Sequence, residues 1–530
     1  MYVWFEEIRA LVGRILGVPR EGGGMDETED GPDLGDELDV AEWILSRFDS
    51  DDEVAVAEVG YLDRTQTTGS ATPAEVRSAD DLSNEGIWWR VFVEGSADYR
   101  FTTSFSESHL EDLMERSIRS ARVLDQRVPA KYDPGTVHQA VHPGWTVGGS
   151  LSDSAATEKL TAVRSAFAES MDGLALDRAA VSYRDERLSS VLLTTTGTTV
   201  RTSLERASVE TVVAPANAEK VQRHFGTTTG PAFFDALPGH FDELAASVRE
   251  RKGYPPLDDA ETTSIGGDGD ADVVFGPRAA AALFHHVAHY LEMDAAYLGS
   301  SPFSVGDRFG PPGLDVEDCV HAGSWAALGY DAEGKPTTPV TLVSDGIVRN
   351  FLHDTVSAIE EETVPMGSVV PSVGYERPPR IHARHLDVAA GSASRASLLD
   401  GADVYVESVE TPRIENEATR TKRASSMPPS VLYAKDIAAT TPSEFEDEAT
   451  TQELTFPVRL GYTVDGSERG KRFAGGAVTV PLGALRSITG IDDVRETVTG
   501  VCSKHRSMIP YAVTAPSIRF SMRFSNLRIC

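Results

Sequence analysis

Short runs of alternating apolar and polar residues, separated by turn signals, dominate this chain and predict strands more often than helices. Residues 54–63 (VAVAEVGYLD) alternate in this way, and residues 86–95 and 98–105 flank a Gly-Ser-Ala turn. Because a strand places every second side chain on the same face, the last two runs predict a hairpin with one buried face. Residues 178–215 predict further antiparallel strands with a turn at Gly197.

Helical spacing of apolar residues is confined to fewer segments. It predicts helices near residues 40–48, 106–124, 154–172 and 234–252. A further helix is predicted across residues 277–297, and Pro277 stands at its first turn, where the missing N–H costs nothing. Helices mixed with antiparallel strands in this way predict an α+β fold.

An acidic, glycine-rich connector, DDAETTSIGGDGDAD, provides the best candidate for a domain boundary. We predict an N-terminal α+β domain over residues 39–230 and a helix with a linker over 231–270. Residues 271–530 are predicted to form a second domain, dominated by antiparallel sheet and carrying one metal-site helix, because turn signals recur there.

Residues 1–38 are predicted to be a disordered acidic extension, because they offer little to bury. Residues 2–17 carry an apolar helical face that is interrupted by charges, which is compatible with a surface-lying membrane anchor. The acidic bias begins only at Met25, so we favour a mis-assigned start before that residue.

The charge balance excludes a nucleic-acid-binding role for the chain. Of its 530 residues, 82 are acidic and 49 basic, and only nine of the basic residues are lysines. A net charge of −33 repels nucleic acid and anionic membranes, and no basic stripe is present. Acidic side chains with little lysine are typical of a high-salt cytoplasm, as in halophilic archaea, because the Debye length is only about 3 Å at 1 M salt. The alternative is an ordinary acidic protein.

Cysteine usage and hydropathy indicate a soluble cytoplasmic protein. Cys319, Cys502 and Cys530 are far apart and odd in number, which excludes a disulfide framework and indicates a reducing compartment. No apolar stretch reaches the roughly 20 residues that span a bilayer.

Three histidines within five residues mark the predicted helix over 277–297. His285 and His289 are four residues apart, which places two imidazoles on one face as potential ligands for a zinc ion. Glu292 falls on the same face. In the zinc peptidase pattern H-E-x-x-H a glutamate follows the first histidine, but here that position is His286.

A zinc site needs a third protein ligand. The candidates from the sequence are Glu292, a distant histidine such as His382 or His385, or a thiolate. The alternative is that the histidines form an exposed or hydrogen-bonded cluster without metal.

The segment FHHVAHYLEMD resembles the signature of the TldD/PmbA family, also called modulators of DNA gyrase. Members of the TldD type read H-E-x-x-x-H followed by G-L-E-G-D. The run GIWWRVFVEGSADYRFTTSF and the helix after it look like the first-domain hairpin and helix of the family. GYTVDGSERGKRFAGGAVTV and TGVCSKHRSMIPYAV resemble its C-terminal sheet, so the similarity covers most of residues 40–525.

The resemblance implies a two-domain α+β subunit and a zinc-dependent peptidase that acts on unstructured peptides. It also implies a homodimer or a heterodimer with a paralogue, usually one that lacks the metal motif. A cysteine in the G-V-C segment is the third metal ligand of TldD members, and Cys502 stands at that position. His505 and Lys504 follow it and are candidates for contacts with a peptide carbonyl or carboxylate.

The metal motif departs from the family pattern at two points. The first histidine of the family would fall at Phe284, so the two ligands are one residue closer here, and the expected glutamate is His286. A positioned general base contributes about 10²- to 10⁴-fold in rate. We predict that His286 or Glu292 moves the proton; alternatively, the chain has lost catalysis and holds peptides for a catalytic partner.

Overall fold

The computed structural model describes residues 37–93, 96–124, 139–141, 151, 154–216, 219–257, 272–319, 321–372, 377–414, 453–504 and 507–520. Contacts gather the residues from Asp36 onward into one compact unit. Residues 1–36 of the predicted N-terminal extension, most of the acidic connector, His505 and Cys530 lie outside the described residues, and the last two residues of that extension, Glu37 and Leu38, are helical instead of disordered. The predicted domain boundaries therefore stay predictions.

The first sheet contains the long alternating runs of the sequence. Its order is β3-β2-β1-β5-β6-β4, with β7 paired to β6, and only the β4–β6 pair is parallel. The strands are β1 (Val56–Ala71), β2 (Val76–Val93), β3 (Ser96–Thr102), β4 (Gln139–Val141), β5 (Leu176–Thr194), β6 (Thr199–Pro215) and β7 (Val221–Thr227). The predicted hairpin is confirmed as β2 and β3, and Gly197, with a φ of 91°, turns the chain from β5 to β6.

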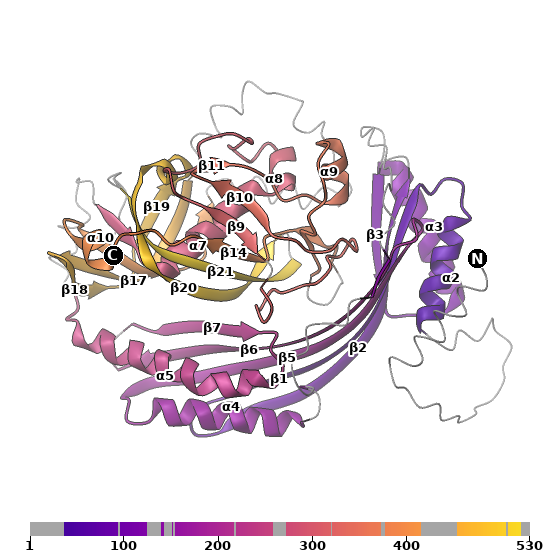
Figure 1. Ribbon diagram of the computed structural model, residues 1–530. Helices are drawn as coiled ribbons and strands as arrows, with labels where there is room; N and C mark the ends of the chain where they lie inside the picture. Colours follow the sequence, from indigo (N-terminus) through magenta and orange to yellow (C-terminus); the bar gives the residue numbers. More distant parts are fainter. Residues whose placement is uncertain are drawn as a thin grey trace. The chain divides into compact units, whose positions relative to one another are not determined.

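Four helices accompany this sheet, close to the predicted positions (Figure 1). They are α2 (Glu37–Asp49), α3 (Glu107–Leu124), α4 (Ala156–Met171) and α5 (Ala232–Gly253). In α4, Leu160, Val163 and Phe167 follow one helical face and are fully buried in a cluster with residues of β5, β6 and α5. The ring of Phe167 lies 5.2 Å from that of Phe241. Apolar spacing therefore determines which helical face covers the sheet.

The second sheet follows the connector and has twelve strands in the main order β11-β10-β9-β14-β21-β8-β15-β17-β16. The strands are β8 (Val273–Phe275), β9 (Val316–Cys319), β10 (Val340–Ser344), β11 (Ile347–Val348), β14 (His385–Val388), β15 (Val404–Val409), β16 (Arg413–Ile414), β17 (Glu453–Asp465), β18 (Glu468–Phe473), β19 (Ala477–Pro481), β20 (Ile488–Lys504) and β21 (Ser507–Phe520). Its pairs are antiparallel except β14–β21 and β8–β15. The prediction of an α+β chain with a sheet-rich C-terminal region is confirmed.

Smaller elements complete this region. They are the pair β12 (Val369–Val370) and β13 (Arg380–Ile381), the short helices α9 (Thr355–Glu360) and α10 (Arg395–Leu399), and the 3-10 helix η5 (Leu482–Ser487). None of the described helices is long and apolar enough to cross a membrane.

Helix α7 (Pro277–Ala288) packs on β21, β15 and β20 of the second sheet and begins at Pro277, as predicted. Its end differs from the prediction of one helix over 277–297. The chain passes from α7 into the 3-10 turn η2 (His289–Leu291) and then into α8 (Met293–Tyr297).

The interruption has a physical cause at Glu292, whose backbone is extended, with φ −100° and ψ 134°. The N–H of Met293 donates to the Leu352 carbonyl at 3.0 Å, and the N–H of Leu352 donates to the Leu291 carbonyl at 2.8 Å. These bonds to a neighbouring segment replace those of a continuous helix. They also direct the Glu292 carboxylate into the interior, where it is completely buried.

Hydrogen bonds connect the two sheet regions. The Arg90 guanidinium of β2 donates to Glu58 of β1. It also donates, at 2.6 Å, to Glu333, which lies between β9 and β10. The N–H of Thr228 donates to the Gly323 carbonyl at 3.2 Å. A buried guanidinium shared by two carboxylates holds both in place, because moving one of them would leave a buried charge without its counter-charge.

Candidate metal centre

The end of α7 supplies the first two side chains of the centre. His285 lies in the last turn of the helix, and His289 is its C-cap residue. Residues four apart lie on one helical face, and the two imidazole centroids are 4.9 Å apart. His285 is only 4% exposed, so the pair is directed into the protein.

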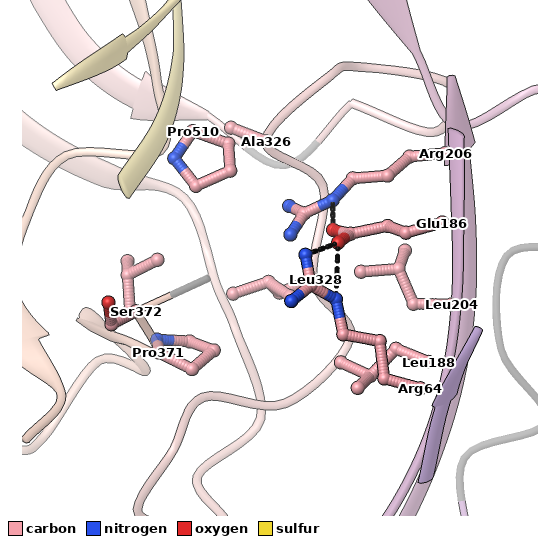
Figure 2. A pocket seen from close by; sticks show the side chains of 11 residues that line it. Arg64, Glu186, Leu188, Leu204, Arg206, Ala326, Leu328, Pro371, Ser372 and Pro510 are labelled. Carbon is pink, nitrogen blue, oxygen red and sulfur yellow. Dashed lines mark hydrogen bonds and ion pairs between the residues drawn. The ribbon is translucent and has the colours of Figure 1, made fainter. Parts of the chain in front are cut away.

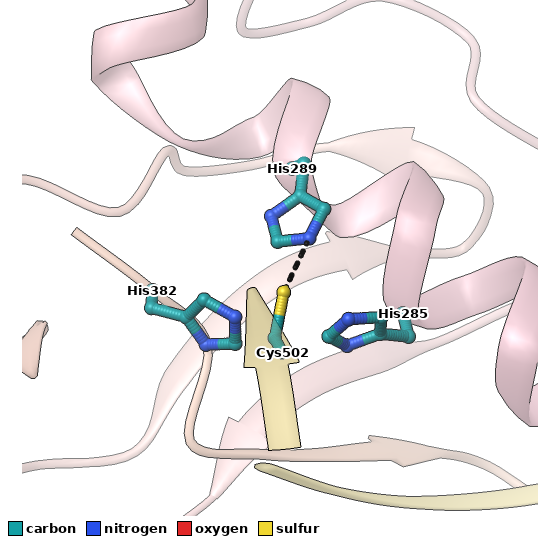
Figure 3. Close-up of side chains that lie close together, drawn as sticks. All are labelled: His285, His289, His382 and Cys502. Atoms are coloured by element: carbon teal, nitrogen blue, oxygen red, sulfur yellow. Dashed lines mark hydrogen bonds between the residues drawn. The ribbon is translucent and has the colours of Figure 1, made fainter. Parts of the chain in front are cut away.

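Two further side chains come from distant parts of the sequence. Cys502 lies in β20, paired with Ile509 of β21, and His382 lies between β13 and β14. Donor atoms of His285, His289, His382 and Cys502 all lie within 4.8 Å of one another. Figure 3 shows the Cys502 sulfur among the three imidazoles. The structure therefore brings together both predicted histidines, the predicted cysteine and one histidine that was only a candidate.

The spacing of these donors suits a tetrahedral ion. The Cys502 sulfur lies 3.5 Å from Nε2 of His289. Zinc with ligands at about 2.3 Å for sulfur and 2.0–2.1 Å for nitrogen has a sulfur–nitrogen edge of about 3.6 Å. The side chains that are present therefore fit a zinc-type ion without rearrangement of this pair.

A buried carboxylate and a lysine support His289 from behind. Both oxygens of Glu292 lie 3.0–3.1 Å from Nδ1 of His289. Since a carboxylate only accepts, Nδ1 carries the hydrogen and Nε2 presents its lone pair to the centre. Lys504 donates to Glu292, to the Ile381 carbonyl at 2.8 Å, and approaches Asp294 at 2.7 Å. These contacts fix the orientation of one ligand.

Charges around Cys502 favour its thiolate form, which is the form that binds metal. Burial alone raises the pKa of the Cys502 thiol, but the charge and hydrogen bond of His289 outweigh burial and lower the pKa to about 6. Burial lowers the pKa of His289, whereas Glu292 and Cys502 raise it to about 10. Without metal, the pair is therefore a thiolate and an imidazolium at neutral pH, and metal binding displaces the imidazolium proton.

His285 stays neutral, as a metal ligand must. Burial, followed by the neighbouring imidazoles His286, His289 and His382, lowers its pKa well below the usual value. Its ring stacks on Tyr511 of β21, with centroids 3.8 Å apart. The stacking restricts the orientation of the His285 ring.

His382 provides the strongest test of whether these residues fit a metal. Its Nδ1 contacts the Ala383 carbonyl, and because a carbonyl only accepts, Nδ1 carries the hydrogen. Its Nε2 is buried and has no hydrogen-bond partner among the described residues. A buried acceptor without a partner is costly, and it faces the donors of His285, His289 and Cys502. A cation or a water molecule at this point would satisfy it.

Comparisons with known proteins agree with this chemistry. Residues 268–421 match the family model of the PmbA/TldA metallopeptidase C-terminal domain. Over 125 residues the chain is 32% identical to a metalloprotease of Synechocystis, in an alignment that covers 22% of this chain and 27% of that relative. Residues 268–421 therefore carry a domain similar to the PmbA/TldA metallopeptidase C-terminal domain, and the alignment with the Synechocystis relative spans only about a quarter of that protein.

Solved structures share the fold of this chain. A protein from Thermotoga maritima named a modulator of a DNA gyrase has a TM-score of 0.65 at 15% identity, covering 92% of this chain and 99% of its own. TldE from Thermococcus kodakarensis has a TM-score of 0.61 at 13% identity, covering 92% and 99%. At these identities the likeness concerns the fold alone.

The remaining candidate residues lie beside the four donors or away from them. His286 is next to His285, with ring centroids 4.8 Å apart, but is not among the four converging residues. Glu292 and Lys504 bind each other behind His289. His385 hydrogen-bonds Ser324 and Thr514 at 2.9 Å, away from the centre.

Sequence reasoning missed Tyr511 and Asp294 as supports of the centre. Asp294 belongs to the LEMD tail whose resemblance to the family was noted, and its pairing with Lys504 gives that tail a physical role. No local sequence pattern predicts that Tyr511 contacts His285, because only the register of β21 places this tyrosine against α7.

A second polar cluster lies in a pocket between the first sheet and the C-terminal region (Figure 2). Glu186 accepts from Arg64 at 2.7 and 3.0 Å and also from Arg206, and apolar residues such as Leu328 and Pro510 line the remainder. Burial raises the pKa of Glu186, but Arg206 and Arg64 outweigh it and lower the pKa to about 2. Every group in this cluster has a partner of opposite charge, in contrast to the α7 centre.

Proposed function

We propose that this chain is a zinc-dependent peptidase subunit that acts on unstructured peptides. The observation that carries the proposal is the convergence of one sulfur and three imidazole nitrogens within 4.8 Å at the end of α7. A thiolate with imidazoles is a donor set that suits zinc and other borderline divalent ions. The match of residues 268–421 to a metallopeptidase domain supports the same chemistry.

In this proposal His285, His289 and Cys502 hold the ion, and the fourth position faces His382. A bound zinc ion supplies polarisation of the scissile carbonyl and a stronger water nucleophile near neutral pH. Glu292 keeps His289 in the tautomer that binds through Nε2, and Lys504 keeps Glu292 ionised and in place.

His382 is the general base that the geometry favours. Its Nε2 is an acceptor without a geometric hydrogen bond among the described residues, and it lies within 4.8 Å of the three atoms that would hold the ion, so a water bound there would be within its reach. It would accept the water proton and return it to the leaving amine. The His382 imidazole would thus replace the glutamate that is absent from position 286.

The predictions that His286 or Glu292 moves the proton stay open, and the contacts weigh against both. Burial and the neighbouring imidazoles lower the pKa of His286 to about 3, which makes it a weak base at neutral pH. Burial raises the pKa of Glu292, but Lys504 and then His289 outweigh burial and hold this pKa far below its usual value. A positioning role suits Glu292 better.

A second candidate function follows from the number of donors. If His382 binds the ion, four protein ligands close the site, as in structural zinc sites, and no position remains for water. The chain would then be a non-catalytic subunit that holds peptide for a catalytic partner in a heteromer.

One variant separates these two functions. If the chain is a peptidase, the His382→Ala variant should keep near-stoichiometric zinc and lose peptide cleavage, because this change removes a base and not a ligand. In the closed-site alternative, the same variant loses zinc affinity, and cleavage by a co-expressed paralogue complex is unchanged. His285→Ala, which removes a ligand in either case, is the matched control. Wild-type protein that purifies without zinc would reject both functions.

We further propose that the protein works in a high-salt cytoplasm and pairs with a second copy or a paralogue. The excess of 82 acidic over 49 basic residues and the scarcity of cysteine support the location. Folding and cleavage should therefore rise with KCl, and full stability in dilute buffer would contradict the high-salt proposal. Light scattering of the chain with and without its paralogue tests the pairing.

A further inference from the structure

A second group of metal-ligand side chains lies on the second sheet, away from α7. Cys319 of β9, Asp387 of β14 and His321 after β9 place one donor atom each within 4.8 Å of one another. In the antiparallel pair β9–β14, Cys319 is opposite His385 and Glu317 is opposite Asp387. Since alternate residues of a strand share a face, these four strand residues project on the same side of the sheet.

This side is the reverse of the one that carries the α7 centre. Asp387 pairs with Thr514 of β21, and the Thr514 hydroxyl lies 2.9 Å from Nε2 of His385. Tyr511, three residues before Thr514, points to the opposite face, where it stacks on His285. The thickness of the sheet therefore separates the two clusters, and residues of one cluster cannot bind an ion in the other.

The distances in the second cluster leave space for an ion. Nε2 of His321 lies 3.7 Å from Oδ2 of Asp387, which is too long for a direct hydrogen bond. Nitrogen and oxygen ligands at about 2.0–2.2 Å on tetrahedral zinc have an edge of about 3.4 Å, so a small closure would suffice.

Acidic side chains surround the sulfur of the second cluster. The Cys319 thiol donates to the Glu317 carboxylate at 3.1 Å. Arg495 donates to Oδ1 of Asp387 and to the Val388 carbonyl at 3.2 Å, which holds the aspartate and leaves Oδ2 turned toward His321. A divalent ion would compensate the acidic groups beside the buried sulfur.

We propose that Cys319, His321 and Asp387 bind a second divalent ion of the zinc class. The side chains of His321 and Asp387 are 48% and 23% exposed, so an ion can enter from solvent and keep a water as its fourth ligand. Binding converts the Cys319 S–H to a thiolate and releases one proton to solvent through Glu317.

The ion would join β9 and β14 to the segment that reaches the first sheet. That segment continues from His321 to Gly323, whose carbonyl accepts from the N–H of Thr228 and from the Thr227 hydroxyl at 2.7 Å. The second site thereby ties the second sheet to the region that contacts β7, without any part in peptide cleavage.

Cobalt binding in a chain without the α7 centre tests this proposal. The full chain should carry His285→Ala, His289→Ala and Cys502→Ser. Titration of this variant with cobalt should produce a thiolate-to-cobalt charge-transfer band that saturates at one cobalt ion per chain. Adding Cys319→Ser should abolish the band. Adding His321→Ala or Asp387→Asn should weaken cobalt binding by at least about tenfold, because even changes to residues that only support a metal ligand typically cost that much. No band, or a band that survives Cys319→Ser, would overturn the proposal.

Zinc stoichiometry keeps the test decisive if the triple variant does not fold. The otherwise unchanged chain should bind two zinc ions, and Cys319→Ser alone should bind one, with peptide cleavage per chain unaltered. One zinc ion in both proteins would refute the second site while leaving the α7 centre intact. An unchanged chain that binds two zinc ions but cleaves no peptide would instead count against the proposed peptidase function alone.

Discussion

Two buried polar clusters in this protein differ in whether their groups satisfy one another. In the pocket of the first sheet, Glu186 is bound by Arg64 and Arg206, so each charged group has a hydrogen-bonded partner of opposite charge. At the end of α7, Nε2 of His382 is buried without a geometric hydrogen bond among the described residues, and it lies within 4.8 Å of the ligand atoms of His285, His289 and Cys502. The buried polar groups of the first cluster have partners without a ligand, whereas a cation would supply the partner that the second cluster lacks. Whether buried polar groups have partners thus separates a structural cluster from a candidate site.

Removal of the base tests the incomplete cluster most severely. His382→Ala should reduce kcat for an unstructured peptide by about 10²- to 10⁴-fold, because a positioned base is lost. KM and zinc content should change little, and a matched His385→Ala variant, which alters a histidine on the other face, should retain cleavage. Equal activity of His382→Ala and wild type in metal-loaded samples would remove His382 from the mechanism.

Breaking the complete cluster should affect folding and not catalytic chemistry. Glu186→Gln leaves two buried guanidinium groups without a counter-charge and should lower the free energy of unfolding by about 3–5 kcal/mol. Denaturant titration measures this loss. Glu75→Gln removes the exposed pair with Arg77 and should cost no more than about 1 kcal/mol. Similar costs for the two variants would show that Glu186 is not buried among charges as described.

The pH dependence of the Glu186 cluster sharpens the same comparison. The folded pKa of Glu186 is lowered to about 2 from an ordinary value of 4.5. A depressed acid contributes stability that is present above the unfolded pKa and is lost as pH falls through the folded pKa. The stability difference between wild type and Glu186→Gln should therefore be constant above about pH 5 and shrink between pH 4.5 and 2. A constant difference throughout that window would contradict the shift.

The smallest expected effect concerns the support of a ligand. Glu292→Gln keeps an acceptor oxygen for Nδ1 of His289 but removes the charge, so zinc affinity should fall by about 10- to 100-fold. Competition with a zinc chelator measures the affinity, and circular dichroism checks that the fold is retained. Unchanged affinity would separate Glu292 from the metal centre.

Local patterns in the sequence predicted much of the fold. The alternation in residues 86–105 and the apolar spacing in α4 depend only on residues a few positions apart along the chain, and both elements form, although β2 begins at Val76, ten residues before the predicted strand. The continuous helix through Glu292 was wrong because a backbone bridge to Leu352 and the burial of its carboxylate replace helical bonds. No local pattern contains that information.

The candidate site was only partly accessible from the sequence. The spacing of His285 and His289 is a local property, whereas Cys502 was identified through the family resemblance. His382 and His385 looked equivalent, yet they are three residues apart, so in an extended segment they point to opposite faces. The structure directs His382 to the α7 centre and His385 to the reverse face. Register between distant strands, not residue type, decides which of them reaches the donors.

X-ray absorption of zinc in the Cys319→Ser protein tests the central claim most directly, because it reports the ligands of the α7 centre alone. The account predicts a shell with one sulfur at about 2.3 Å and imidazole nitrogens at about 2.0–2.1 Å, and the sulfur should vanish in Cys319→Ser combined with Cys502→Ser. A protein that binds no zinc, or a shell without sulfur in the Cys319→Ser protein, would contradict it.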